Sequence, residues 1–358
     1  MENKPTQPDL SVWQGREDPE DGAAGLRFHQ AVKPPTDASG LSSTVDLIGF
    51  ACEEGVRRNK GRLGAKQAPQ RIRQALSNMA WHHSCVLRDL GDIACDSSSD
   101  ATRDPLADAQ TLLANSVAQS LNTGHFPIIL GGGHEVAWGS YQGLASHLKA
   151  QHLQQPQLKA KHPKQQSTRK DSPPRIGIIN FDAHFDLRPL VEGKGSSGTP
   201  FNQIAQYCEA QGWPFHYACI GVSRTSNTQT LFKRAEALNV TIIEDVDCAN
   251  EQRLLQQILQ FAAGCDALYL TVDLDVFPAS QAPGVSAPAV LGVDYRIVES
   301  LIRTIAALRD AQGQRLLRLA DIAEYNPTVD QDNQTARLAA RLIWQLCATF
   351  NNNETSPS

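Results

Sequence analysis

The chain has 358 residues, of which 41 % are hydrophobic and 20 % charged, a composition typical of a globular protein and not of a disordered, collagen-like or membrane-spanning chain. Its net charge of −5 leaves no basic excess to neutralise nucleic-acid phosphates. No apolar run reaches about 18 residues, so we expect no membrane partner. The eight cysteines occur without a CxxC pair, which indicates free thiols and a cytoplasmic protein. Cys52 is a candidate redox-sensitive thiol.

Short apolar, β-branched runs alternate with longer amphipathic segments from Thr44 onward. We expect strands at Val45–Phe50, Phe126–Leu130, Ile176–Phe181, Tyr217–Val222, Val240–Ile243, Ala267–Val272 and Leu316–Ile322, with a weaker candidate at Cys85–Leu90. We expect helices at Ala68–Met79, Leu106–Asn122, Glu135–Ala150, Gln229–Ala237, Gln252–Phe261, Tyr295–Ala311 and Asn333–Cys347. Strands that are apolar on both faces and separated by helices indicate a parallel sheet covered on both sides.

The same pattern predicts how the chain is organised. Residues 1–40 are acidic and polar without apolar periodicity, and we expect an irregular N-terminal arm there. Residues 41–350 form a single predicted domain, interrupted at 151–174 by a segment rich in Gln, Lys and Pro. That segment is typical of a polar insertion loop. The tail at 351–358 is expected to fray.

The first chemically informative segment is a strand that runs into a glycine-rich turn. The apolar residues 127–130 are followed by three glycines and then by His134. Glycines let the backbone turn sharply and approach another group closely. Such a turn could also cradle a phosphate, but its spacing fits neither the dinucleotide fingerprint nor the P-loop. His134 is therefore a candidate metal ligand at the end of a strand.

Two further strand ends carry acidic residues. Asp182, His184 and Asp186 alternate with apolar residues, so in an extended segment all three side chains lie on one side. Asp273 and Asp275 follow another apolar run in the same way. Carboxylates that converge without a cation repel one another, so this pattern indicates a metal site. The alternative interpretation of Asp182–Asp186 is a polar loop with a helix cap. Because carboxyl ends of parallel strands meet at one edge of a sheet, we expect these side chains to lie together.

The combined set contains two imidazoles, four carboxylates and no sulfur, which suits Mn²⁺ better than a tetrahedral structural Zn²⁺. Six side chains are too many for one catalytic ion, and they suit two ions roughly 3.5–4 Å apart. A water that bridges two such ions supplies hydroxide near neutral pH. The residues therefore predict metal-assisted hydrolysis.

Three segments in order resemble the signature regions of the ureohydrolase superfamily, which includes arginase and agmatinase: Gly131–His134, Asp182–Asp186, and the run from Thr271 to Gly292. The resemblance extends from about Val45 to Ala348. It implies an arginase-like, three-layer α/β/α sandwich on an eight-stranded parallel sheet. It also implies two Mn²⁺ ions per subunit and assembly into a homo-oligomer.

The resemblance implies specific ligands and roles. One ion would be held by His134, Asp182, Asp186 and Asp273, and the other by Asp182, His184, Asp273 and Asp275. A hydroxide that bridges the ions would attack the amidine carbon, while Asp186 passes its proton to the leaving amine. Glu324 would bind the planar substrate cation through paired hydrogen bonds. The alternative for Glu324 is a structural pair with a neighbouring arginine.

Two departures separate the branches of this superfamily. Ser197 stands where arginase and agmatinase carry a histidine that assists proton transfer, and Arg188 lies two positions beyond Asp186. Together with Gly55–Ala65, these features resemble the formimidoylglutamase branch, which hydrolyses N-formimino-L-glutamate to L-glutamate and formamide in histidine degradation. That substrate is a small amidine with two carboxylates, which the guanidinium of Arg188 suits.

Further contacts and competing functions stay open. Ser197, Arg224 and Asn227 are candidate substrate-binding residues, with Arg58 and Asn59 on weaker grounds; the alternative is that these are ordinary loop residues. One competing function is a guanidino hydrolase, such as an arginase or agmatinase, that releases urea. Another, from a different class, is a non-catalytic metal-binding paralogue.

Overall fold

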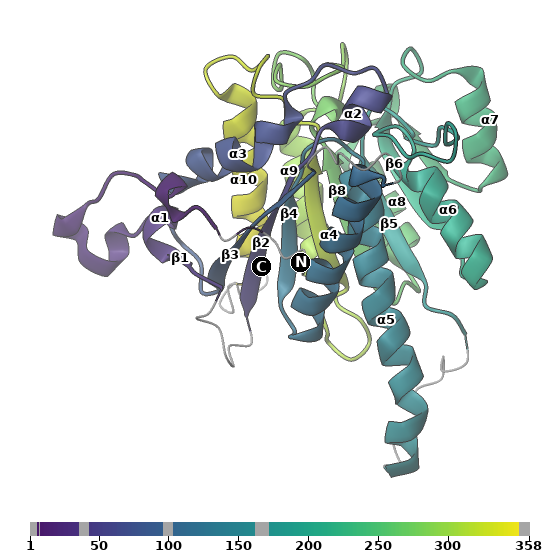
Figure 1. Cartoon of the computed structure of the whole chain (residues 1–358), viewed down its shortest axis with the longest axis horizontal. Coiled ribbons are helices and arrows are strands. Elements are labelled where there is room, and N and C mark those ends of the chain that lie inside the picture. Colours follow the sequence, from purple (N-terminus) through teal and green to yellow (C-terminus); the bar gives the residue numbers. More distant parts are fainter. Residues whose placement is uncertain (1–5, 7, 36–42, 96–102, 162–171, 351–358) are drawn as a thin grey trace.

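In the computed structural model, a nine-stranded parallel sheet runs through the part of the chain that is described, residues 6, 8–35, 43–95, 103–161 and 172–350 (Figure 1). Its strands lie in the order β1-β3-β2-β4-β9-β8-β5-β6-β7. Their bounds are β1 Val32–Lys33, β2 Thr44–Ala51, β3 Val86–Ala94, β4 Phe126–Leu130, β5 Ile176–Phe181, β6 His216–Val222, β7 Thr241–Glu244, β8 Ala267–Asp273 and β9 Leu317–Ala323. All eight predicted strands are present. The ninth, β1, pairs with β3 through two residues and is too short to show a periodicity.

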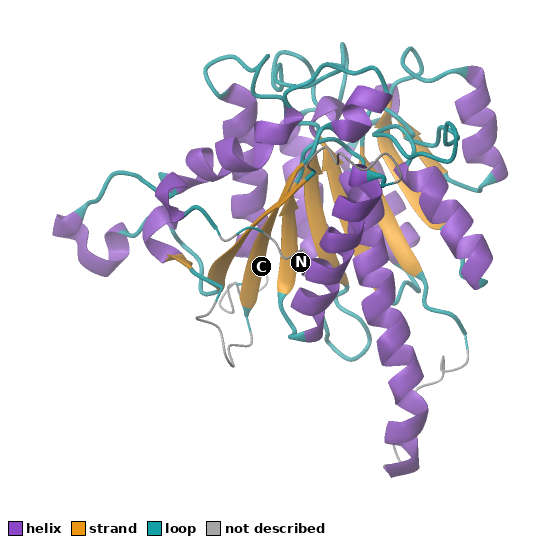
Figure 2. Cartoon of the chain, viewed as in Figure 1, coloured by secondary structure: helices purple, strands orange, loops and turns teal. Residues whose placement is uncertain are grey.

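Helices cover both faces of the sheet, so the predicted three-layer sandwich is confirmed (Figure 2). Along β8, Leu268, Leu270 and Val272 enter one core, whereas Tyr269 enters the other. The first core is closed by α3 Ala68–Ser77, α8 Glu251–Ala262, α9 Tyr295–Ala307 and α10 Gln334–Ala348. The second core is closed by α4 Pro105–Asn122, α5 Val136–Lys161, α6 Pro200–Gln211 and α7 Gln229–Ala237.

Two segments differ from the sequence-based expectation. The loop predicted at 151–174 begins as helix, because α5 continues to Lys161 and projects past the sheet (Figure 1). Gln, Leu, Lys and Ala favour helix intrinsically even without an apolar period. Residues 162–171 of that prediction lie outside the described residues. Helix α6 was not predicted, and it follows directly on the segment that contains Ser197.

The described part of the predicted N-terminal arm contains short helical elements. It forms two 3-10 helices, η1 Leu10–Val12 and η2 Pro19–Gly25, and the short helix α1 Phe28–Ala31. Trp13 and Phe28 are buried, and the Trp13 indole donates a hydrogen bond to Asp89 at 2.8 Å. Two apolar anchors therefore attach this arm to the body. The predicted tail at 351–358 lies outside the described residues.

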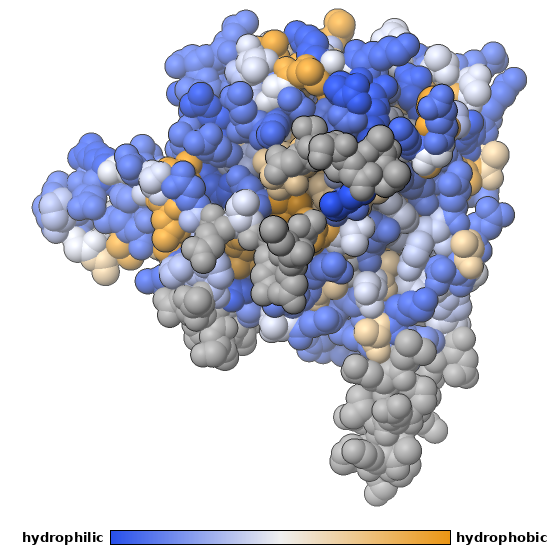
Figure 3. Space-filling view, in the orientation of Figure 1, coloured by the Kyte–Doolittle hydropathy of each residue, from blue (hydrophilic) through white to orange (hydrophobic). Residues whose placement is uncertain are grey.

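All eight cysteines are free thiols, as predicted. Among the described residues no helix is both long and apolar enough to cross a membrane. The described surface that faces the viewer in Figure 3 is mostly hydrophilic, with hydrophobic residues in small patches.

Four neighbouring strands bring the candidate site together. In the order β4-β9-β8-β5, their carboxyl ends lead to His134, Glu324, Asp273 and Asp182. The chain passes from β4 to β5 across the positions later filled by β9 and β8. Such a change in strand order is where open α/β sheets place their ligand sites.

The turn after β4 requires glycine at position 132. A Cβ there would lie 1.7 Å from the carbonyl oxygen of Cys52. Gly132→Ala should therefore lower the free energy of unfolding by about 3 kcal/mol, because the backbone must shift. The measurement is urea denaturation of both proteins. Gly193→Ala is the control: its φ is 72° but nothing lies within 4 Å, so we expect a loss of about 1 kcal/mol. Equal losses in the two variants would contradict the prediction.

Candidate metal centre

His134 is held from three directions. Its ring Nε2 lies 3.0 Å from the Thr271 hydroxyl, and the edge of Phe201 packs against the ring with centroids 5.3 Å apart. Its backbone N–H donates to Glu324 Oε1 at 2.9 Å. The side chain is completely buried. These contacts leave Nδ1 facing the acidic residues at the neighbouring strand ends.

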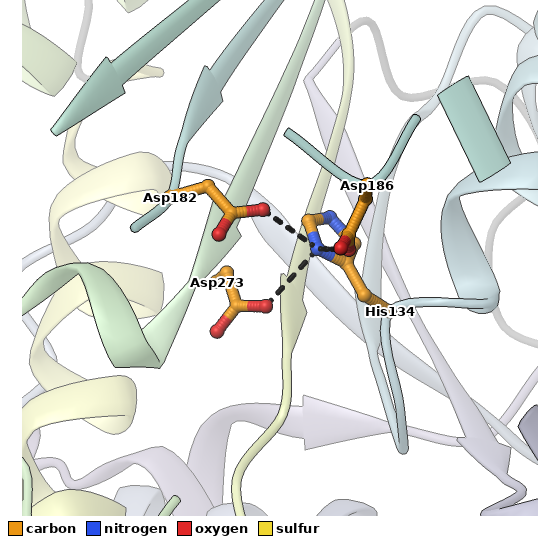
Figure 4. A group of neighbouring side chains, drawn as sticks. All are labelled: His134, Asp182, Asp186 and Asp273. Atoms are coloured by element: carbon orange, nitrogen blue, oxygen red, sulfur yellow. Dashed lines mark ion pairs between the residues drawn. The ribbon is translucent and has the colours of Figure 1, made fainter. Parts of the chain in front are cut away.

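Three carboxylates converge on that nitrogen (Figure 4). Nδ1 of His134 lies 3.1 Å from Asp182, 3.1 Å from Asp186 and 3.0 Å from Asp273. The nitrogen is buried and makes no hydrogen bond of regular geometry. One N–H cannot donate to three oxygens, so the four ligand atoms, all within 4.8 Å of one another, are arranged as they would be around a cation.

A second group of ligand atoms lies beside the first. His184 Nδ1 is 3.0 Å from Asp275 and 3.6 Å from Asp182, and the three residues form a second candidate metal site. Asp182 belongs to both groups. Asp273, which the resemblance implies for both ions, belongs to the first group alone. Two adjacent groups that share a carboxylate form a candidate binuclear metal site.

The acids of the first group repel one another. Burial, followed by the charge of Asp182, raises the pKa of Asp186 to about 6. Burial, followed by the charges of Asp275 and Asp182, also holds the pKa of Asp273 well above its usual range. Buried carboxylates at this spacing carry an electrostatic penalty that a divalent cation removes.

The histidines respond in the opposite sense. Burial alone lowers the pKa of His134, but the carboxylates of Asp182, Asp186 and Asp273 beside its Nδ1 outweigh burial, and the pKa is raised. For Asp182, burial raises the pKa, but His134 and His184 together outweigh burial, and the pKa is lowered. The candidate metal-ligand atoms are carboxylate oxygens and imidazole nitrogens in an acidic site. Such atoms suit two hard or borderline divalent ions.

Two positioning residues were missed from the sequence. Asn180 donates to Asp182 Oδ2 at 2.9 Å, and Thr271 contacts the His134 ring. Both are polar residues inside otherwise apolar strands. A buried polar side chain in a central strand needs a hydrogen-bonding partner, and this signal could have identified them.

The backbone at two candidate catalytic residues is unusual. Asp186 has a φ of 47° and Glu324 a φ of 64°, in the left-handed region that residues other than glycine seldom adopt. Glu324 is fixed there by its backbone N–H, which donates to the Gly132 carbonyl at 2.8 Å. Non-glycine residues in this region cluster at functional sites.

A cavity of about 890 Å³ opens onto the site. The candidate ligands that line it are His184, Asp186, Asp273 and Asp275. Glu324 also lines it and makes no ion pair with any residue in the described ranges, so the structure does not support its alternative pairing with an arginine. Burial, followed by the charge of Glu135, raises the pKa of Glu324 to about 8.

The predicted substrate contacts divide into two groups. Arg188, Ser197 and Asn227 line the cavity. Arg224 does not: its guanidinium pairs with Glu244 and lies 4.5 Å from the centre of the Phe232 ring.

Asn227 lies in the cavity wall, but its amide is already used. It donates to the carbonyls of Ala183 and Ser223, both at 2.8 Å, and accepts from Phe185 N at 3.1 Å. The structure therefore gives Asn227 a supporting role beneath the Asp182–Asp186 segment. Arg224 therefore lies outside the cavity, and the amide of Asn227 is held by backbone groups.

The fold and the site together define an α/β/α protein with a candidate binuclear metal centre. The family model described as "Arginase family" matches residues 43–348. The chain belongs to the arginase family. The predicted superfamily and the predicted class of enzyme, a hydrolase of amidine C–N bonds, are therefore confirmed.

Similar proteins carry a more specific name. The chain is 47 % identical over 357 residues to a formimidoylglutamase of Aliivibrio fischeri, with 96 % of each chain covered. It is 51 % identical over 350 residues to a formimidoylglutamase of Vibrio vulnificus, with 95 % of each covered. Its fold resembles a Trypanosoma cruzi formiminoglutamase with Mn²⁺, at a TM-score of 0.70 and 20 % identity, covering 96 % of this chain and 98 % of that one. It also resembles a Bacillus subtilis arginase, at a TM-score of 0.65 and 24 % identity, covering 85 % and 98 %.

Proposed function

We propose that this protein hydrolyses N-formimino-L-glutamate to L-glutamate and formamide, with two Mn²⁺ ions, as a step of histidine degradation. The main supporting observation is that one cavity is lined by four of the candidate metal ligands, by Glu324 and by Arg188. The substrate offers the matching groups, an amidine and two carboxylates. The names of the relatives that are about half identical support the same substrate.

The six predicted side chains would hold the ions. One ion would be held by His134, Asp182, Asp186 and Asp273, and the second by Asp182, His184 and Asp275. The family resemblance implies that Asp273 would also be a ligand of the second ion. Bound divalent ions lower the pKa of coordinated water, so that hydroxide is available near neutral pH.

The chain's own residues orient the substrate and move protons. Glu324 binds the planar amidinium by charge-assisted hydrogen bonds, while one of its oxygens also accepts from His134 N. Asp186 transfers a proton to the glutamate nitrogen as the bond from that nitrogen to the formimino carbon breaks. Water supplies the oxygen of formamide, and the glutamate nitrogen leaves as an amine.

Arg188 and Ser197 would bind the glutamate end. Arg188 makes no ion pair with any residue that the structure describes, so its guanidinium is available to a carboxylate. Arginine presents a planar fork of donors that suits this group. The domain division, a homo-oligomeric assembly and a cytoplasmic location stay predictions from the sequence.

Parallel product assays test the substrate. Manganese-loaded protein is offered N-formimino-L-glutamate, arginine and agmatine, and the products are separated by chromatography. The proposal expects glutamate and formamide from the first substrate alone. Urea from arginine or agmatine would favour a guanidino hydrolase. Inactivity on all three, with metal confirmed as bound, would favour the non-catalytic paralogue.

Thr271→Val tests the support of the His134 ring. Valine keeps the shape of threonine but removes the hydroxyl 3.0 Å from Nε2. We expect Mn²⁺ affinity to fall by roughly 10–100-fold, as for other groups that orient metal ligands. The measurement is a metal titration by calorimetry, with the exposed Thr230→Val as control. Unchanged affinity in Thr271→Val would contradict this role.

A further inference from the structure

The basic side chains that line the cavity are not equally available. Arg57 pairs with Glu54 at 2.6 Å. Arg62 donates to the carbonyls of Val285 and Ser286 at 2.6 and 2.8 Å. Both guanidinium groups are therefore engaged by the local structure.

Arg58 joins two walls of the cavity. It lies in helix α2, Glu54–Arg58, and pairs with Asp104 at 2.6 Å and with Glu54 at 2.9 Å. It also donates to the Gly195 carbonyl at 3.0 Å. This arginine therefore fixes the end of α2 against the segment that contains Ser197, and we expect it to act as a positioning residue.

The next residue, Asn59, reaches the same segment. Its amide nitrogen donates to Ser197 Oγ at 3.2 Å, across 138 positions of sequence. Gly198 lies beneath two side chains at once: a Cβ there would be 2.9 Å from Arg188 Cδ and 3.2 Å from each of the two polar amide atoms of Asn59. Arg188 and Asn59 thus pack side by side over one glycine.

These side chains form a small pocket of hydrogen-bond donors, which we call the donor niche: Asn59, Arg188 and Ser197 over Gly198. Three donor groups remain beside the Asn59–Ser197 hydrogen bond: the Arg188 guanidinium, the second amide hydrogen of Asn59 and the Ser197 hydroxyl. A group that only accepts hydrogen bonds and carries negative charge matches this set.

We propose that the donor niche binds a carboxylate of the substrate, and that Asn59 is a specificity-determining residue within it. The inference rests on the proposed function, because it assigns the acidic end of that substrate. Asn59 lies outside the three signature segments, at the end of helix α2. It therefore adds a contact that the metal-binding motifs do not provide.

Asn59→Asp tests the niche, because it keeps the size of the side chain but replaces the amide with a negative charge. We expect KM for N-formimino-L-glutamate to rise at least about tenfold, with kcat within about twofold. Asn59→Ala should raise KM less, since it removes a donor without adding repulsion. With N-methylformamidine, which has no carboxylate, Asn59→Asp and wild type should have equal kcat/KM. A rise in KM of less than twofold would overturn the proposal, as would an equal loss with both substrates.

Two further measurements separate the possible failures. Asn239→Asp makes the same chemical change outside this cavity and should leave KM unchanged. Binding of L-glutamate to the manganese-loaded protein, followed by calorimetry, needs no turnover, and its Kd should also rise at least about tenfold in Asn59→Asp. If wild type binds glutamate in this way but does not hydrolyse the substrate, the proposed function fails and the niche stands. If wild type does not bind glutamate, the niche fails.

Discussion

Asp182→Asn is expected to lower kcat by at least about a thousandfold, which corresponds to about 4 kcal/mol of lost transition-state stabilisation. Asp182 is the residue that both groups of ligand atoms contain. An asparagine is a poor ligand for a divalent ion because it carries no charge, and it would leave the Nδ1 side of His134 with one fewer carboxylate. The loss should affect both ions together.

Metal analysis of the purified variant measures this loss directly. We expect fewer than two Mn²⁺ ions per chain by elemental analysis, together with the loss of kcat. Asp108→Asn is the matched control, because Asp108 lies on the surface of α4 and, among the described residues, its carboxylate pairs only with Arg103. Full metal content with wild-type kcat in Asp182→Asn would refute the shared-ligand role.

Glu324→Gln should lower kcat/KM by about a hundredfold while metal content stays at the wild-type level. Glutamine retains an oxygen that can accept from His134 N, which the carboxylate now accepts at 2.9 Å. What it loses is the negative charge opposite the amidinium. A hydrogen bond to a charged partner contributes about 1.5–3 kcal/mol, and the upper half of that range corresponds to about a hundredfold.

Steady-state kinetics with N-formimino-L-glutamate measure the effect. Glu192→Gln makes the same change at an exposed residue that lines the same cavity, and we expect its kcat/KM to stay within about threefold of wild type, as for a screened surface charge. An equally small effect in Glu324→Gln would show that Glu324 does not bind the reacting cation.

The central strands and their acidic ends were predictable because two independent signals coincide there. Apolar runs that are buried on both faces identify β4, β5 and β8, and the polar residues that follow them fall at carboxyl ends. Parallel strands place those ends at one edge. The structure accordingly brings His134, Asp182, His184, Asp273 and Asp275 together with Asp186.

The side chains around the cavity were harder to predict, because their partners come from distant parts of the sequence. Arg224 pairs with Glu244 at the end of β7, and the Asn227 side chain hydrogen-bonds to backbone groups. Asn59 contacts Ser197 across 138 positions of sequence, where Arg58 also connects the same two segments. Nothing local in the sequence distinguishes a loop polar group that stays free from one that is already paired.

The most direct test of the central claim is a titration of metal-free protein with Mn²⁺, in which formamide and glutamate are quantified at each step. Two adjacent groups of ligands predict that activity rises to a plateau at two equivalents of metal per chain, with formamide and glutamate formed in equal amounts. A plateau at one equivalent would contradict the binuclear site. Release of ammonia with N-formylglutamate, in place of formamide with glutamate, would contradict the proposed cleavage of the bond to the glutamate nitrogen.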